Sequence, residues 1–319
     1  MLWKTGLIAG FGLTLTLAGC GGTTTEEPAE AQNSNLPQLV FPNEPAPDVF
    51  HRAYTMTENA DGSVRLFARE DRDDTDLYQT NLQDDGSWSE PVKLDWPKLR
   101  SNNAPHFSPF DGRLYFVSDR PVPGLETRSD LNIWSVELTE DGWGEASPIP
   151  GDVHYGANET SVTTTADGEM VFVSVRREGP GAQDFYQAHF DQAAAGWMFD
   201  GLLAEASSPL VESHIAATPD GAHLIFYSRI RPILGNVDLK VISRGEDGEW
   251  IGPYTLGTNI NTRGIEYGAG MSASGDTFFF SREGQLMEMP MEALLEEIEA
   301  AQAAYLADEE LEFLGLSDN

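Results

Sequence analysis

The 319-residue chain has one cysteine, Cys20, and four lysines among its 19 basic residues. A chain with a single thiol forms no internal disulfide, so packing and hydrogen bonding have to stabilise the fold. The 52 acidic residues give a formal net charge of −33, and such a surface repels nucleic acid. We therefore expect no nucleic-acid partner. Two explanations of the charge stay open: solubility in a saline habitat, or attraction of a cationic partner or of divalent ions.

Long apolar runs are also scarce, and the clearest one, over residues 7–18, is too short to span a bilayer as a stable helix. It follows Lys4 near the N-terminus, which predicts a signal peptide over residues 1–19. Leu17-Ala18-Gly19-Cys20 resembles the lipobox of bacterial lipoproteins. That resemblance implies lipidation of Cys20 and membrane attachment through the lipid. In that family Gly21, in place of Asp, implies the outer membrane, facing the periplasm; the alternative is an ordinary secretory signal with a chance cysteine.

After a polar tether over residues 20–35, the sequence repeats with a period of 54 residues. The period is carried by an aspartate followed by an apolar residue, at Asp76, Asp130, Asp184 and Asp238. An Asp-Gly turn precedes each of these aspartates and a tryptophan follows each one, at Trp88, Trp143, Trp197 and Trp250. β-rich runs lie between these markers. Each unit therefore predicts four strands, which is the content of one β-propeller blade.

A fifth unit, over residues 266–289, lacks the strand that carries tryptophan. Residues 36–43 resemble the missing piece, so we predict that this N-terminal segment closes the ring and removes its open edge. The sequence thus predicts an all-β fold, a single propeller of about five four-stranded blades over residues 36–289, with six blades as the alternative. Residues 290–319 predict an acidic amphipathic helix and tail. Packing on the side or rim of the propeller is favoured over partner docking.

Two stretches carry a resemblance to a known family. Residues 104–134 look like the WD40-like repeats of TolB-type propellers, and residues 250–262 are similar to a variant repeat found beside OmpA-like domains. The resemblance implies the propeller fold. It does not imply one activity, because the family includes transport accessories, sensor modules and lids on hydrolases. TolB itself has six blades and an extra α/β domain, and the sequence shows neither.

Polar residues recur where each innermost strand is predicted to begin. Counting back eight residues from the turn positions gives Ala53 in the first unit and then the polar residues Asn103, Glu159, Glu212 and Glu266. Four histidines lie near these positions: His51, His106, His154 and His214. We predict that these residues gather at one channel mouth as a ligand site. The alternative is a set of structural contacts that recur with the repeat. A glycoside hydrolase would need at least two of the glutamates within catalytic reach.

A second periodic set accompanies the aspartates: Arg69, Arg120, Arg176, Arg229 and Arg282 each end the second strand of a unit. We predict an Asp-Arg pair that braces the loop of each blade. The acidic loop over residues 69–76 is a weak Ca²⁺ candidate, with a solvated loop as the alternative; otherwise no cofactor is expected. The chain also lacks the Gly-x-Ser-x-Gly motif of serine hydrolases. The sequence favours an envelope lipoprotein that binds or scaffolds a protein or glycan partner without catalysis, with a carbohydrate-active hydrolase as the alternative.

Overall fold

The computed structural model describes residues 35–48, 51–124, 128–154 and 156–316. The predicted signal peptide, the lipidated Cys20 and nearly all of the tether lie outside these residues. Within the described part of the chain, no helix is both long and apolar enough to cross a membrane.

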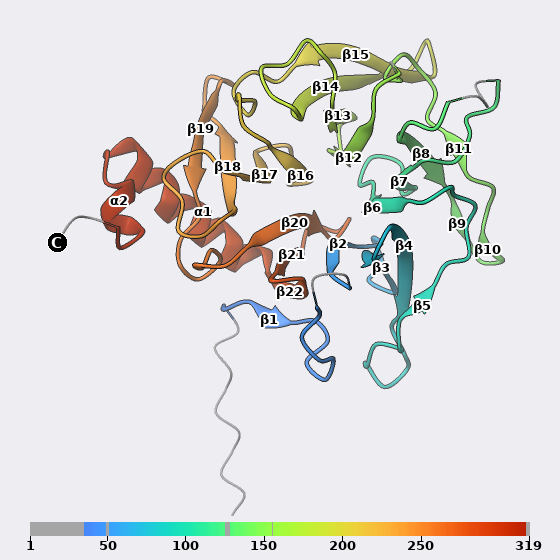
Figure 1. Cartoon of the computed structure of the whole chain (residues 1–319), viewed down its shortest axis with the longest axis horizontal. Coiled ribbons are helices and arrows are strands. Elements are labelled where there is room, and N and C mark those ends of the chain that lie inside the picture. Colours follow the sequence, from blue (N-terminus) through green and yellow to red (C-terminus); the bar gives the residue numbers. More distant parts are fainter. Residues whose placement is uncertain (1–34, 49–50, 125–127, 155, 317–319) are drawn as a thin grey trace, which may run out of the picture. The chain divides into compact units, whose positions relative to one another are not determined.

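Five four-stranded antiparallel sheets form the blades of a propeller (Figure 1). Blade 1, from its innermost to its outermost strand, contains β2 (Ala53–Glu58), β3 (Val64–Asp71), β4 (Asp74–Asn81) and β5 (Val92–Lys93). Blade 2 contains β6 (Asn102–Phe107), β7 (Leu114–Ser118), β8 (Asn132–Val136) and β11 (Ser147–Pro148), with the hairpin β9 (Leu138–Thr139) and β10 (Gly142–Trp143) between the last two. Blade 3 contains β12 (Glu159–Thr164), β13 (Glu169–Ser174), β14 (Asp184–Asp191) and β15 (Gly196–Leu202).

The last two blades complete the ring. Blade 4 contains β16 (Ser213–Ala217), β17 (His223–Ser228), β18 (Asp238–Arg244) and β19 (Trp250–Thr255). Blade 5 contains β20 (Glu266–Met271), β21 (Thr277–Arg282), β22 (Gln285–Pro290) and, from the other end of the chain, β1 (Gln38–Leu39). The prediction of five blades is confirmed, and the alternative of six is wrong. The tryptophans of blades 1 and 2 do not start the outermost strand, which begins four residues after each of them.

The apolar core lies between neighbouring blades. Each strand places alternate side chains on its two faces. One face of a blade packs against the preceding blade and the other face against the following blade. Phe185 of blade 3 and Phe226 of blade 4, for example, are fully buried with ring centroids 4.8 Å apart. Packing between neighbouring blades therefore stabilises the ring.

The ring closes as the sequence predicts. β1 pairs with β22, with Leu39 opposite Met287, and the Val40 amide donates to the Leu286 carbonyl at 3.0 Å. The innermost strands β20 and β2 also approach closely at this junction. A Cβ at Gly270 would lie 2.0 Å from the Met56 carbonyl oxygen, so the approach requires glycine there.

The C-terminal segment forms α1 (Met291–Leu306) and the short α2 (Glu310–Phe313). Leu294, Ile298 and Ala301 of α1 are buried in one apolar cluster with Tyr254 of blade 4 and Phe280 of blade 5. The helix therefore packs on the propeller, which is the interpretation that the sequence favoured.

Candidate functional site

One face of the propeller carries several hollows. We call it the loop face; it is formed by the connections from each outermost strand to the next blade and by the connections between the second and third strands of each blade. The opposite face carries the Asp-Gly turns. Five hollows are lined wholly or in part by residues of the loop face, and the periodic residues singled out by the sequence also lie at this end of their strands.

The three predicted glutamates are fully buried at the starts of their strands. Glu212 accepts hydrogen bonds from the Ser208 amide at 3.1 Å and from the Ser208 hydroxyl at 2.6 Å. Glu266 accepts the same two bonds from Thr262. Ser208 and Thr262 belong to the connections that lead into blades 4 and 5. These carboxyls are therefore structural, as the alternative interpretation proposed, and burial raises the pKa of both above the ordinary value.

Glu159 has a different environment. One of its oxygens lies 3.6 Å from Arg176, and the other lies 3.8 Å from His154. Burial raises the pKa of Glu159 as well. The negative charge of an aspartate in the preceding blade also raises the pKa of each glutamate: Asp130 acts in this way on Glu159, Asp184 on Glu212 and Asp238 on Glu266. The structure thus places each glutamate at its own junction between blades and does not bring them together as a catalytic set.

Asn103 is not the blade 2 counterpart of these glutamates. The turn of blade 2 is one residue longer than the others, since Gly112 donates to the carbonyl four residues before it while Gly62 donates to the carbonyl three residues before it. Counting back from the turn therefore lands one residue too late. The counterpart is Asn102, which is buried and accepts a hydrogen bond from Arg120 at 3.1 Å.

The predicted Asp-Arg pairs are not formed, because the arginines and the aspartates of the two series bind other groups. Arg282 lies 3.5 Å from Glu266, while Arg69 bonds Glu44. Asp76 instead binds two lysines, Lys93 at 2.6 Å and Lys98 at 2.8 Å. The other aspartates act locally: Asp130 pairs with Arg128, and Asp184 and Asp238 accept backbone N–H groups of the loops that precede them, at Gly181 and at Leu234 and Gly235. Arg229 is exposed on the loop face. The two series recur with the repeat, although they do not pair with each other.

The four predicted histidines lie in four different environments. His106 accepts from the Thr164 amide of blade 3 at 3.0 Å, and burial lowers its pKa to about 3. His214 packs between the rings of Tyr54, Tyr227 and Tyr267, and burial lowers its pKa to about 4. His154 lies beside Glu159, and His51 lies in a surface pocket. The channel mouth is therefore not one site of acids and imidazoles.

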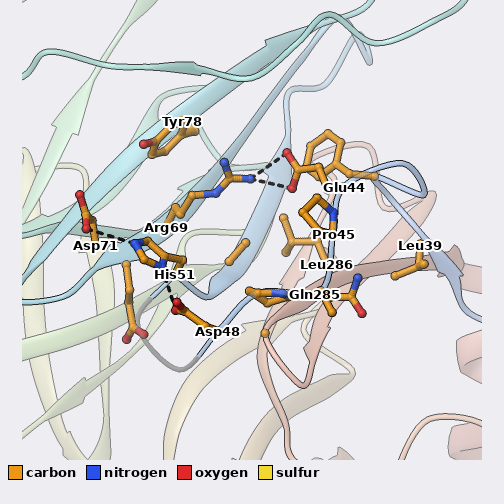
Figure 2. A pocket seen from close by; sticks show the side chains of 16 residues that line it. Leu39, Glu44, Pro45, Asp48, His51, Arg69, Asp71, Tyr78, Gln285 and Leu286 are labelled. Atoms are coloured by element: carbon orange, nitrogen blue, oxygen red, sulfur yellow. Dashed lines mark hydrogen bonds and ion pairs between the residues drawn. The ribbon is translucent and has the colours of Figure 1, made fainter.

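One hollow on the loop face lies where the ring closes, and we call it the closure pocket (Figure 2). It has a volume of about 590 Å³. Three parts of the chain line it: residues 39–48 with His51 and Ala53, residues 69–78 of blade 1, and residues 284–286 of blade 5. The floor is apolar, with Phe41 packed on Phe67 at a centroid distance of 5.4 Å.

Charged groups surround this floor in two arrangements (Figure 2). Arg69 donates to both oxygens of Glu44, at 2.9 and 3.1 Å, and its guanidinium lies 4.9 Å from the ring of Tyr78. His51 lies between two carboxylates, with Nδ1 at 2.7 Å from Asp48 and Nε2 at 3.4 Å from Asp71. Because a neutral imidazole carries one N–H, it donates to one of these carboxylates at a time.

Sequence reasoning found two residues of this pocket, His51 and Arg69, and gave Arg69 a structural role. It missed Glu44, Asp48 and Tyr78, because the pocket forms only when the N-terminal segment folds against the last blade. The acidic loop that was a Ca²⁺ candidate contributes Asp71 to the pocket rim. Within the described part of the chain, no three His, Cys, Asp or Glu side chains gather as metal ligands.

Comparison with known proteins adds little to this description. No protein-family model matches the chain, and no curated protein matches it. Among solved structures, it is similar to TolB from Acinetobacter baumannii at 14% identity and a TM-score of 0.41, covering 75% of this chain and 54% of that one. It is also similar to a putative TolB from Agrobacterium tumefaciens at 18% identity and a TM-score of 0.44, covering 73% and 70%. A glycosyl hydrolase from Bacteroides ovatus gives 11% identity and a TM-score of 0.46, covering 75% and 83%.

The chain thus spans about half the length of the Acinetobacter TolB. TolB structures are thus among the solved structures to which this chain is similar. These likenesses say nothing about activity, and the number of blades follows from the strand pairing alone.

Proposed function

We propose that the protein is an envelope lipoprotein that binds a protein or glycan partner through the loop face, without catalysis. The observation that carries the proposal is the closure pocket, a preformed hollow of about 590 Å³ with an apolar floor and a charged rim. Pockets of this size and lining bind small groups of a ligand or of a partner protein. The lipid on Cys20 holds the propeller at the periplasmic side of the outer membrane.

The carboxyl groups that a hydrolase would use favour binding over catalysis. Glycoside hydrolysis needs two carboxyls on opposite sides of one bond. Glu212 and Glu266 instead accept backbone and hydroxyl hydrogen bonds within the connections between blades. Their removal is expected to destabilise the ring rather than to abolish a reaction.

Capture of the partner from native envelopes tests the proposal. Ala46 is exposed on the pocket rim, so Ala46→Trp places an indole at the pocket mouth without a change of charge. The matched control is Ala303→Trp, at an exposed position of α1. We expect crosslinking to recover the same partner with the wild type and the control and to lose it with Ala46→Trp. Recovery of no partner by any of the three proteins, together with turnover of a glycoside panel, would reverse the proposal.

The anchor is tested separately. Metabolic labelling with a fatty acid is expected to mark the wild type and not Cys20→Ser, and the variant is expected to leave the membrane fraction. Labelling of both proteins, or of neither, contradicts lipidation at Cys20.

A further inference from the structure

The arginines of this chain are distributed unevenly between its two faces. Eight of the fifteen make an ion pair or a hydrogen bond through the guanidinium, and these include every arginine near the Asp-Gly turns: Arg65, Arg113 and Arg244. The remaining seven make no ion pair or side-chain hydrogen bond with any residue that the structure describes, and all seven lie on the loop face. In a chain with 52 carboxylates, arginines without partners are not explained by a shortage of acids.

Four of these arginines lie on neighbouring blades together with exposed aliphatic residues. We call this set the arginine patch, and it consists of Arg177, Leu210, Val211, Arg229, Arg231 and Arg263. All four arginines are exposed, while Leu210 and Val211 are 44% and 37% exposed.

Backbone contacts join the loops that carry the patch. Gln183, at the end of the loop that starts with Arg177, forms a bridge with Val211. In the same way Asn236, at the end of the loop that carries Arg229 and Arg231, donates to the carbonyl of Gly264, next to Arg263, at 3.0 Å. The patch is therefore a continuous part of the loop face, from blade 3 to the start of blade 5.

The charge of the patch differs from that of the closure pocket on the same face. The loop 229–236 contains two arginines and no acid, and the segment 262–264 contains one arginine and no acid. The pocket rim, in contrast, holds Glu44, Asp48, Glu70 and Asp71 against Arg69 and one histidine. Carboxylates border the patch, with Glu178 beside Arg177 and with Asp308 and Glu310 in the hollow that Arg231 lines. Among the residues that the structure describes, none of these carboxylates forms an ion pair with an arginine of the patch. The guanidinium groups are therefore available to the carboxylates of a partner.

The neighbouring side chains indicate the class of that partner. Arginine beside exposed aliphatic residues is the composition of a protein interface, because the guanidinium binds carboxylates in a bidentate manner while the aliphatic groups lose water. A membrane with anionic headgroups is disfavoured by the net charge of −33. We infer that the arginine patch docks a protein partner through a segment that carries Asp or Glu side chains and interspersed aliphatic residues. This inference rests on the proposed function and specifies its partner.

The first experiment uses a labelled peptide of alternating Glu and Leu pairs as the probe. The test variant is Arg229→Gln/Arg231→Gln/Arg263→Gln, and the matched control is Ala300→Glu/Gln302→Glu/Ala303→Glu on the exposed part of α1, which shifts the net charge by the same amount. We expect at least tenfold weaker binding for the arginine variant, little change for the control, and wild-type affinity that falls linearly with log salt. Equal binding by both variants overturns the inference. So does binding of the wild type to polygalacturonate or to phosphatidylglycerol vesicles in preference to the peptide.

The second experiment distinguishes this inference from the proposed function. A photoreactive side chain is introduced at Leu210 or at Ala303 in the full lipidated protein, and envelopes are irradiated. We expect one protein to crosslink at position 210, at an acidic segment, and not at position 303, with loss of the crosslink in the arginine variant. A partner that is recovered equally well by the arginine variant overturns the inference and leaves the proposed function intact. Failure to recover any partner counts against both.

Discussion

Arg65 of blade 1 and Glu288 of blade 5 lie 2.9 Å apart across the junction that closes the ring. Arg65 also binds Glu58 at 2.6 Å and is stacked over Trp88 and Phe279, with only 9% of its side chain exposed. One guanidinium therefore joins the second strand of the first blade to the third strand of the last blade. The pairing of β1 with β22 spans only two residues, so side chains such as Arg65 contribute much of the stability of the closed ring.

Arg65→Ala is expected to lower the free energy of unfolding by about 3 kcal/mol, because it leaves the buried Glu58 carboxylate without its partner. The control is Arg113→Ala, which removes a 3.6 Å pair with a largely exposed Glu137 and is expected to cost less than about 1 kcal/mol. Urea denaturation measures both. Similar losses for the two variants would show that Arg65 does not hold the junction.

Gly270→Ala is expected to destabilise the protein by about 3 kcal/mol, since the added methyl group would collide with the Met56 carbonyl and force blades 1 and 5 apart. Gly144→Ala is the control, because a Cβ there would lie 3.5 Å from its nearest neighbour. Thermal unfolding, followed by circular dichroism, compares the two. A melting temperature for Gly270→Ala equal to that of the control contradicts the close approach of β20 and β2.

The burial of His106 predicts that the free energy of unfolding rises with pH. Its pKa is lowered from 6.5 to about 3 by burial, so between these values the unfolded state binds a proton that the folded state does not. Stability therefore rises with pH across this window, by about 1.4 kcal/mol per pH unit. His106→Gln keeps an acceptor for the Thr164 amide and is expected to lose this slope. Urea midpoints of both proteins between pH 4 and pH 7 test it, and parallel curves would falsify the prediction.

The burial of Glu212 predicts the opposite effect, a free energy of unfolding that falls as pH rises. Burial raises its pKa above 4.5, so in the window above that value the folded state holds a proton that the unfolded state has released. Stability is fully present below the unfolded pKa and falls as pH rises through the folded pKa. Glu212→Gln keeps an acceptor for the Ser208 amide. We expect its melting temperature to gain on that of the wild type between pH 4 and pH 8, whereas a constant difference contradicts burial of an ionisable group.

The fold could be predicted because its signals are local and repeated. The 54-residue period, the turns and the tryptophans each occur within one blade, and the same pattern recurs in four units. The N-terminal strand was also predictable, because its sequence resembles the segment after the first tryptophan. Asn103 was misplaced by a single residue, since nothing in the sequence around Asp111 shows that its turn is closed by a longer hydrogen-bonded ring.

The candidate site was much less predictable. Phe41, Tyr78 and Leu286 line one hollow although more than 240 residues separate the first from the last. Their side chains carry no period and match no motif, so only the closed ring brings them together. The partners of the periodic arginines were missed for a related reason. A repeat shows which residues recur, but it does not show their partners. The local geometry of each junction places Arg282 beside Glu266 and Arg69 beside Glu44.

The origin of β1 has a consequence for the order in which the protein is assembled. As the chain is synthesised, blades 1 to 4 each have all of their strands once their own segment has emerged, whereas blade 5 needs the first strand that the structure describes. Until the two ends meet, the edge of β22 is bare and open to pairing with a strand from another molecule. The strand that is synthesised first among those described is therefore among the last to be fixed, and a chaperone would be most useful in that interval.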